Sequence, residues 1–147
     1  MKPLRHSFRK YLHKKGLLFN VTDTPEGVLY FGLIEVQPSV NVGVGMLIFE
    51  ADHKLLCEIV FSDIAYHAGE DFREQILELL NKVNLEYKSY YKLCIEKDGF
   101  VVLQTTVHFS SFGAVNRALC DGVKALAALY PEINDQVQRI EESNELS

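Results

Sequence analysis

The stretch VLYFGLIEVQ, Val28–Gln37, constrains the fold more than any other part of the chain. Its length and its β-branched and aromatic content predict a β-strand, yet it is apolar at nearly every position. Successive side chains of a strand point to opposite faces, so the pattern makes both faces apolar. One face receives Val28, Tyr30, Ile34 and Val36, and the other receives Leu29, Phe31 and Leu33. Both faces of the sheet therefore need a cover.

Apolar periodicity predicts a helix over residues 3–15, with a stripe of Leu4, Phe8, Tyr11 and Leu12. Four strand candidates follow: Leu17–Thr22, Val28–Gln37, Val44–Ala51 and Lys54–Ser62. The sequence QPSVNVG, residues 37–43, predicts a longer connection between two of these strands. ADHK, residues 51–54, is short enough for a tight hairpin.

A second helix is predicted from about Gly69 to Asn84. After it, YKLCIEKDGFVVLQTTVHF predicts two strands joined by a type I′ turn at Asp98-Gly99, because glycine tolerates positive φ. A last helix begins near Ser111 or Phe112, and Pro131 is expected to end or kink it. Ile133, Val137 and Ile140 continue the apolar pattern, and the tail from about 141 to 147 is expected to fray.

The predicted fold is one α+β domain spanning residues 1–147, with helices packed on an antiparallel sheet in the order α-β-β-β(-β)-α-β-β-α. A chain of 147 residues is long enough for one sizeable core. The net charge of −5 disfavours general nucleic-acid binding. No apolar stretch has the length of a signal peptide's apolar core or of a membrane-spanning helix. Three widely separated cysteines indicate free thiols in a reducing compartment, so we expect a cytoplasmic protein.

Motifs for catalysis, metal ions or cofactors are not recognisable, so we expect a non-enzymatic protein without a cofactor. GVGM, residues 43–46, faintly resembles a phosphate loop, but a strand follows it where such a loop would open a helix. Its glycines instead indicate a bulge or a close backbone approach. The alternative hypothesis is a small-molecule-binding or enzymatic domain with its pocket between the sheet and the C-terminal helix. Its polar groups would be Gln104, Thr106 and His108.

The first predicted helix is strongly basic, and residues 1–22 contain no acidic residue. Its cations form either a solvated face or a contact for an anionic membrane or nucleic acid. The residues for such a contact are Arg5, Arg9, Lys10, Lys14 and Lys15.

The second face of the sheet provides the most specific functional hypothesis. Leu29, Phe31 and Leu33 would form an apolar patch there, which Phe100 and Val102 could enlarge. Three covers are possible: a second copy of the chain, a partner protein, or a helix of the same chain that crosses to this face.

The stretch LLNKVNLEYKSYYKLCIEKDGFVVLQTTV has a pattern that is similar to that of a known protein family. A helix ending in asparagine-rich sequence, then a strand, a DG turn and a long strand, resembles the pattern of YbjN-like proteins. The order of elements also resembles the class I type III secretion chaperone fold. Asn81, Asn84, Asp98 and Gly99 carry the likeness. We expect the asparagines to cap or end the helix and Asp98-Gly99 to form the turn.

The resemblance implies a small homodimeric protein that binds other proteins. The secretion chaperones hold an unfolded client segment against apolar surface patches, and YbjN-like proteins are described as sensory or regulatory factors. The sequence thus predicts a cytoplasmic, chaperone-like or regulatory protein-binding domain that forms a homodimer.

Overall fold

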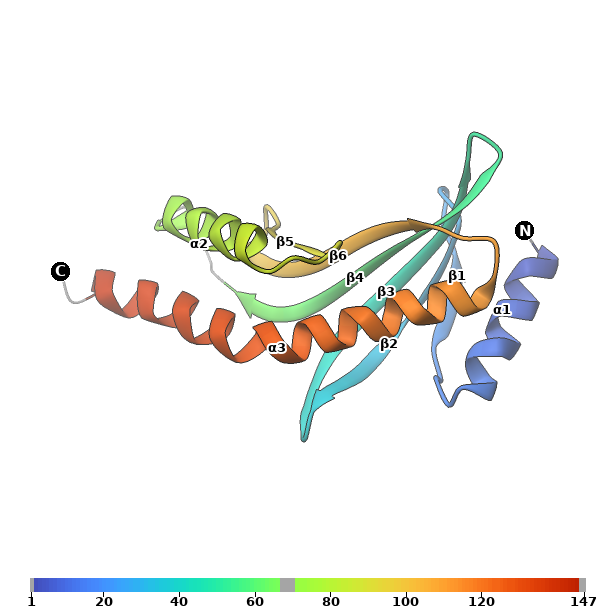
Figure 1. Ribbon diagram of the computed structural model, residues 1–147, viewed down its shortest axis with the longest axis horizontal. Coiled ribbons are helices and arrows are strands. Elements are labelled where there is room, and N and C mark those ends of the chain that lie inside the picture. The colour runs from blue at the N-terminus through green and yellow to red at the C-terminus, as the bar shows by residue number, and fades with distance from the viewer. Residues whose placement is uncertain (1, 67–70, 146–147) are drawn as a thin grey trace.

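The structure, a computed structural model, describes residues 2–66 and 71–145 and has an α+β fold (Figure 1). The elements are α1 (Lys2–Lys14), β1 (Asn20–Asp23), β2 (Val28–Gln37), β3 (Val40–Ala51), β4 (Lys54–Tyr66), α2 (Arg73–Glu86), β5 (Lys92–Ile95), β6 (Phe100–His108) and α3 (Phe112–Glu145). The predicted order of helices and strands is confirmed, with four strands before α2. The start predicted for α2, Gly69, lies outside the described residues.

The six strands form one antiparallel sheet in the order β1-β2-β3-β4-β6-β5. The first four strands are a meander, and the hairpin of β5 and β6 joins the free side of β4 through β6. The register aligns Tyr30 with Met46, Met46 with Ile59, and Phe61 with Leu103. All five side chains are almost fully buried, so these rows define the face that carries the core.

The three described helices contribute to this core. Phe8 and Leu12 of α1, Ile76 and Leu80 of α2, and Leu119, Leu126 and Ile133 of α3 belong to the same buried cluster as the sheet residues. In Figure 1, α3 runs the length of the molecule across the sheet, α1 lies beside its N-terminal end, and α2 lies next to β5. We call the sheet face that carries the core the inner face and the opposite one the outer face.

The longer connection predicted over residues 37–43 is wrong. β2 ends at Gln37 and β3 begins at Val40, so Pro38 and Ser39 alone make the turn, with Ser39 at φ 65°. Residues 40–43 extend β3 instead, opposite the second half of β2. The strand β4 also continues past the predicted end, through an irregularity that contains Asp63 at φ 63°.

Both predicted hairpins are present, and the one at ADHK is tight, as expected. Asp52 and His53 have φ values of 52° and 62°, as a type I′ turn requires. In the second hairpin Gly99 has φ 96°, whereas Asp98 is not among the described residues with positive φ. The N–H of Gly99 donates to the carbonyl of Glu96 at 3.0 Å. The loop is thus a three-residue type with glycine in the left-handed position, and the predicted type I′ turn is wrong.

The last helix does not end at Pro131, which lies inside α3. Proline has no N–H to donate to the carbonyl oxygen four residues earlier, which belongs to Ala127. The side-chain Nε2 of Gln37, at the end of β2, donates to this oxygen at 3.2 Å. A residue of the sheet therefore replaces the hydrogen bond that Pro131 removes from the helix.

The predicted capping role of Asn84 is also wrong. Its Oδ1 accepts from the backbone N–H of Leu93 at 2.8 Å, and its Nδ2 donates to the carbonyl of Leu93 at 3.0 Å. Leu93 lies on β5, which is an edge strand of the sheet. Asn84 thus pairs with β5 as a neighbouring strand would. Asn81 is exposed on α2.

Candidate protein-binding surface

The outer face is built by cross-strand rows that continue over the whole sheet. One row consists of Asn20, Phe31, Gly45, Val60, Gln104 and Lys92, one residue from each strand. The next consists of Thr22, Leu29, Leu47, Glu58 and Thr106. In both rows the apolar residues lie on β2, β3 and β4, and the polar residues lie mostly at the sides of the sheet.

The apolar part of this face is exposed. Phe31 is 41% exposed and Leu33 is 70% exposed. Five other apolar residues of β2, β3 and β4 on this face are half-buried: Leu29, Leu47, Phe49, Leu56 and Val60. We call these seven residues the outer apolar face. The buried side chains of the described helices belong to the cluster on the inner face, so within the described chain no helix is seen to cover it.

Phe100 and Val102, which could enlarge the predicted patch, differ in their exposure. Phe100, on β6, is 39% exposed. It pairs with Tyr66, the last residue of β4, and so lies away from Leu56 and Val60, the β4 residues of the outer apolar face. Val102 is only 2% exposed and cannot belong to an exposed surface of the monomer. It pairs with Cys94 of β5 on one side, and the irregular part of β4 lies on the other. The strand pattern alone did not indicate this burial.

A hollow of about 410 Å³ opens on the outer apolar face. Its lining includes Leu29, Phe31 and Val60, together with Gly43 and Gly45 of β3. A Cβ atom at Gly43 would lie 2.5 Å from Oγ of Ser62, so the close neighbour of this glycine is a side chain and not the backbone that was predicted. A Cβ atom at Gly45 would make only an ordinary contact, 3.6 Å from Leu29 Cδ1. Sterics therefore do not require glycine at position 45, and its missing side chain keeps the hollow open.

The sequence patterns did not predict the hollow, nor four of the seven residues of the outer apolar face. Leu47, Phe49, Leu56 and Val60 alternate with core residues along β3 and β4, as Leu29 and Phe31 do along β2. Glycine at every second position, 43 and 45, was the available sign that one strand face lacks side chains.

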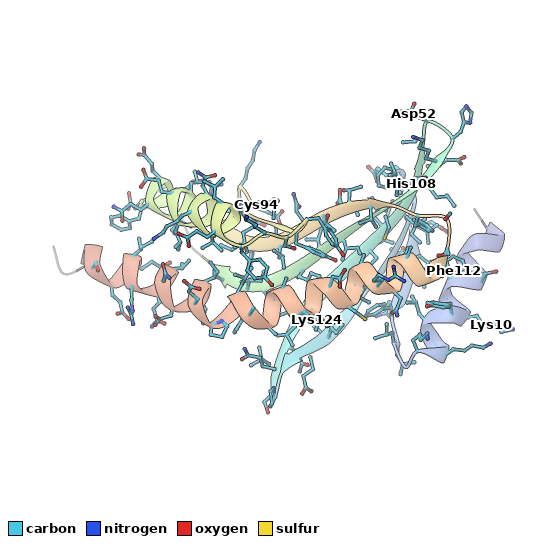
Figure 2. All side chains as sticks on the ribbon, in the orientation of Figure 1. Lys10, Asp52, Cys94, His108, Phe112 and Lys124 are labelled. Carbon is cyan, nitrogen blue, oxygen red and sulfur yellow. The ribbon has the colours of Figure 1, made fainter. Side chains whose placement is uncertain are left out.

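The three residues predicted for the alternative ligand site do not lie between the sheet and α3. Gln104, Thr106 and His108 pair with Val60, Glu58 and Leu56, so they lie on the outer face and are exposed. The hollow that does lie between the sheet and α3 is lined by residues of β2 and α3, among them Ile34 and Leu119, and by none of these three residues. Figure 2 shows His108 near the end of β6, toward the β3–β4 hairpin that carries Asp52.

The described apolar residues Phe8 and Leu12 of the basic helix α1 are buried in the core. Phe8 is fully buried and Leu12 is 2% exposed. Arg9, Lys10, Lys14 and Lys15 are exposed, and the ammonium of Lys15 lies 5.7 Å from the centre of the Tyr11 ring. The side chain of Arg5 lies outside the described ones. Among the described side chains of α1, the two most apolar residues of the stripe, Phe8 and Leu12, are thus part of the core.

Several groups have pKa values moved by their surroundings. Burial, with the nearby Glu58 carboxylate, raises the pKa of Cys57 to about 12. Burial and then a 2.5 Å hydrogen bond to Asp121 raise the pKa of Tyr90 to about 12. Burial also raises the pKa of Tyr91, whose hydroxyl donates to the carbonyl of Ala118 at 2.6 Å. A raised pKa stabilises the protonated form of each group, and the two tyrosines donate their hydrogen bonds in that form.

Among residues 2–66 and 71–145, no group of three or more histidine, cysteine or acidic side chains could hold a metal ion. Within the same residues, no helix is both long enough and apolar enough to cross a membrane. A scan against protein-family models and a search of curated proteins found no match to the chain.

Proposed function

We propose that the chain is a protein-binding domain, chaperone-like or regulatory, that acts without catalysis through its outer apolar face. The observation that carries the proposal is the exposure of Phe31 and Leu33 on a sheet face that the described helices leave open. Seven apolar side chains on three adjacent strands form a contiguous patch, and soluble proteins use such patches as interaction sites.

Two further observations support the proposal. The hollow above Gly43 and Gly45 can accept a side chain of a partner, as pockets in interface centres do. The order of elements, together with the DG hairpin, resembles YbjN-like proteins and type III secretion chaperones, which implies protein binding. The first partner we propose is a second copy, related by a twofold axis, because one face can then cover the other. The three cysteines are unpaired, which supports a cytoplasmic location.

The test is the solution mass of the protein, measured by light scattering across a concentration series, for the wild type and Phe31→Asp. We expect a wild-type dimer at low micromolar concentration. Phe31→Asp would place an unpaired charge in the interface, which costs about 3 kcal/mol or more and weakens association about a hundredfold. Circular dichroism should show that the variant monomer keeps its fold, because Phe31 is already 41% exposed.

A matched pair of variants shows whether a new charge weakens association only when it lies on the outer apolar face. Leu33→Asp and Leu85→Asp change leucines that are 70% and 73% exposed, one on the outer apolar face and one on α2. Only Leu33→Asp should weaken the dimer. If Phe31→Asp unfolds the protein, Phe31 is part of the core and the proposed surface loses its support. A wild type that stays monomeric at high concentration would exclude the second copy as the partner.

A further inference from the structure

Large side chains and glycines lie side by side on the outer apolar face. Phe31 and Leu33 of β2 are its two most exposed residues, and we call them the ridge. Their cross-strand partners on β3 are Gly45 and Gly43, which have no side chain. Both glycines belong to the lining of the hollow, together with Val60 of β4, the next strand. The ridge and the hollow are therefore adjacent on this face.

The ridge does not fill the hollow within one chain. Apart from the chain neighbours of Gly45, the one described atom within 4 Å of a Cβ atom placed there is Leu29 Cδ1, at 3.6 Å. Phe31, the direct partner of Gly45 across the strands, thus leaves this glycine uncovered. An exposed ring and an uncovered glycine are both available to another molecule.

Two copies of this face are complementary in shape. Sheets that pack face to face lie about 10 Å apart with their strands roughly aligned, and a large side chain on one sheet fits best opposite a small one on the other. A twofold axis along the strands, between β2 and β3, places β2 of each copy over β3 of the other. Because Phe31 and Gly45 lie at the same level of the two strands, this axis brings Phe31 of each copy opposite Gly45 of the other. Leu33 comes opposite Gly43 in the same way.

The next row of the face is compatible with the same axis. Leu29 pairs with Leu47, so each of these leucines would meet the other type in the second copy. The same row continues to Thr22 on β1 and to Glu58, a half-buried residue of β4. The axis places these two opposite each other across the interface, where the threonine hydroxyl can donate to the carboxylate. A second copy therefore supplies both an apolar and a polar match.

We propose that the protein forms a homodimer in which Phe31 of each copy enters the hollow of the other copy at Gly45. The alternation of large side chains on β2 with glycines on β3 makes the face complementary to itself, and this determines the choice of partner. The inference rests on the proposed function, because it uses the outer apolar face, but it adds which residues of that face meet.

The test uses two variants that each disturb the fit. Phe31→Ala leaves the hollow of the other copy empty, and Gly45→Val fills the hollow, so that Phe31 of the other copy no longer fits. Each variant alone should weaken self-association at least about tenfold.

A mixture of the two variants should restore association. In the mixed dimer one contact is the original Phe31 against Gly45, and the other joins the new alanine to the new valine without a clash. We expect its affinity to lie within about threefold of that of the wild type. Isotope labelling of one variant allows native mass spectrometry to distinguish the mixed dimer from the two homodimers.

A matched mixture tests whether the recovery is specific. Leu33→Ala mixed with Gly45→Val should not recover, because Phe31 of the first chain still meets the new valine of the second. Circular dichroism checks that each variant is folded. If one of them unfolds, Phe31→Leu and Gly45→Ala repeat the test with smaller changes, and each should weaken association several-fold and recover in the mixture.

The inference is supported by recovery in the mixture of Phe31→Ala and Gly45→Val alone. Without recovery there, or with equal recovery in the matched mixture, the inference fails, because the face then associates in another arrangement. A monomeric wild type would also overturn it and leave the face to a different protein. These results are distinct from failure of the proposed function, in which Phe31→Asp would associate as the wild type does.

Discussion

At the scale of single residues, α3 depends on a hydrogen bond from outside the helix. Pro131 leaves the carbonyl oxygen of Ala127 without its helical donor, and Gln37 supplies one from the sheet at 3.2 Å. An unsatisfied carbonyl in a partly buried site costs about 1–3 kcal/mol. The position of Pro131 in the middle of a 34-residue helix is therefore compatible with a stable fold.

This pairing predicts a coupling between two distant positions. Gln37→Met keeps the length of the side chain but removes the donor, so the free energy of unfolding should fall by about 1 kcal/mol. In a Pro131→Ala background the alanine N–H can serve the carbonyl of Ala127, and the same substitution should cost much less. Urea denaturation of the four proteins of this double-mutant cycle measures the coupling. Equal costs in the two backgrounds would show that Gln37 does not replace the missing donor.

Contacts of this kind explain why the sequence did not predict every role. Pro131 correctly marks a place where the helix loses a hydrogen bond, but the chain alone does not show that Gln37 comes within reach of it. Asn84 was expected to end α2, because asparagine is common at helix termini. Its actual partner, Leu93, becomes apparent only once β5 is known to lie beside α2.

At the scale of elements, local patterns predicted helices and strands well where periodicity is strong. Val28–Gln37 was predicted with its observed bounds, because β-branched and aromatic residues fill it and turn residues flank it. The turn at Pro38-Ser39 was missed because Asn41 and Gly43 look like loop residues. In the structure Asn41 is exposed near the end of β3, and Gly43 lies where Ser62 approaches. Of the outer apolar face, only the β2 residues were predicted, and the predicted extension to Phe100 and Val102 is wrong, since the partners of β2 depend on the order of strands.

The two glycines of β3 give a prediction at this scale. Gly45→Ala should raise the free energy of unfolding by about 0.5–1 kcal/mol, because alanine lowers the entropy of the unfolded chain and a Cβ there meets only Leu29 Cδ1 at 3.6 Å. Gly43→Ala should gain less or destabilise, since its Cβ would lie 2.5 Å from Ser62 Oγ. Thermal and urea unfolding measure both effects.

Gly45→Ala also tests whether the hollow is part of the interface. If a partner side chain enters it, Gly45→Ala should weaken self-association several-fold in spite of its greater stability. An association constant that is unchanged by Gly45→Ala would show that the hollow is not part of the interface.

At the scale of the whole molecule, the two faces of one sheet differ in burial. The inner face holds the residues that join the helices into one core, and the outer face exposes Phe31 and Leu33. A chain in which 48% of the residues are hydrophobic can supply both faces. The stability of the monomer then depends on the inner face, and this makes the outer apolar face available for contacts that the fold itself does not need.

Phe8 tests whether the basic helix belongs to this single core. Its ring contacts Tyr30 of β2 edge-on, with 4.8 Å between centroids, and Phe112 of α3 at 5.0 Å. Figure 2 shows Phe112 at the end of α3 next to α1. Because the side chain is fully buried where α1, β2 and α3 meet, Phe8→Ala should lower the free energy of unfolding by about 3–5 kcal/mol. The exposed neighbour Ser7 offers the control, and Ser7→Ala should change stability by less than about 0.5 kcal/mol.

The outcome also decides between the two hypotheses for α1. If the helix is part of the core, fluorescence and circular dichroism should follow one cooperative unfolding transition in Phe8→Ala, shifted to lower urea concentration. If α1 instead acts as a separate amphipathic helix for anionic surfaces, the variant should unfold like the wild type. It would then lose affinity for anionic lipid vesicles, because Phe8 would belong to the membrane-facing stripe. The burial of Phe8 and Leu12 favours the first outcome, in which the cations of α1 remain at the surface and its apolar side chains stabilise the fold.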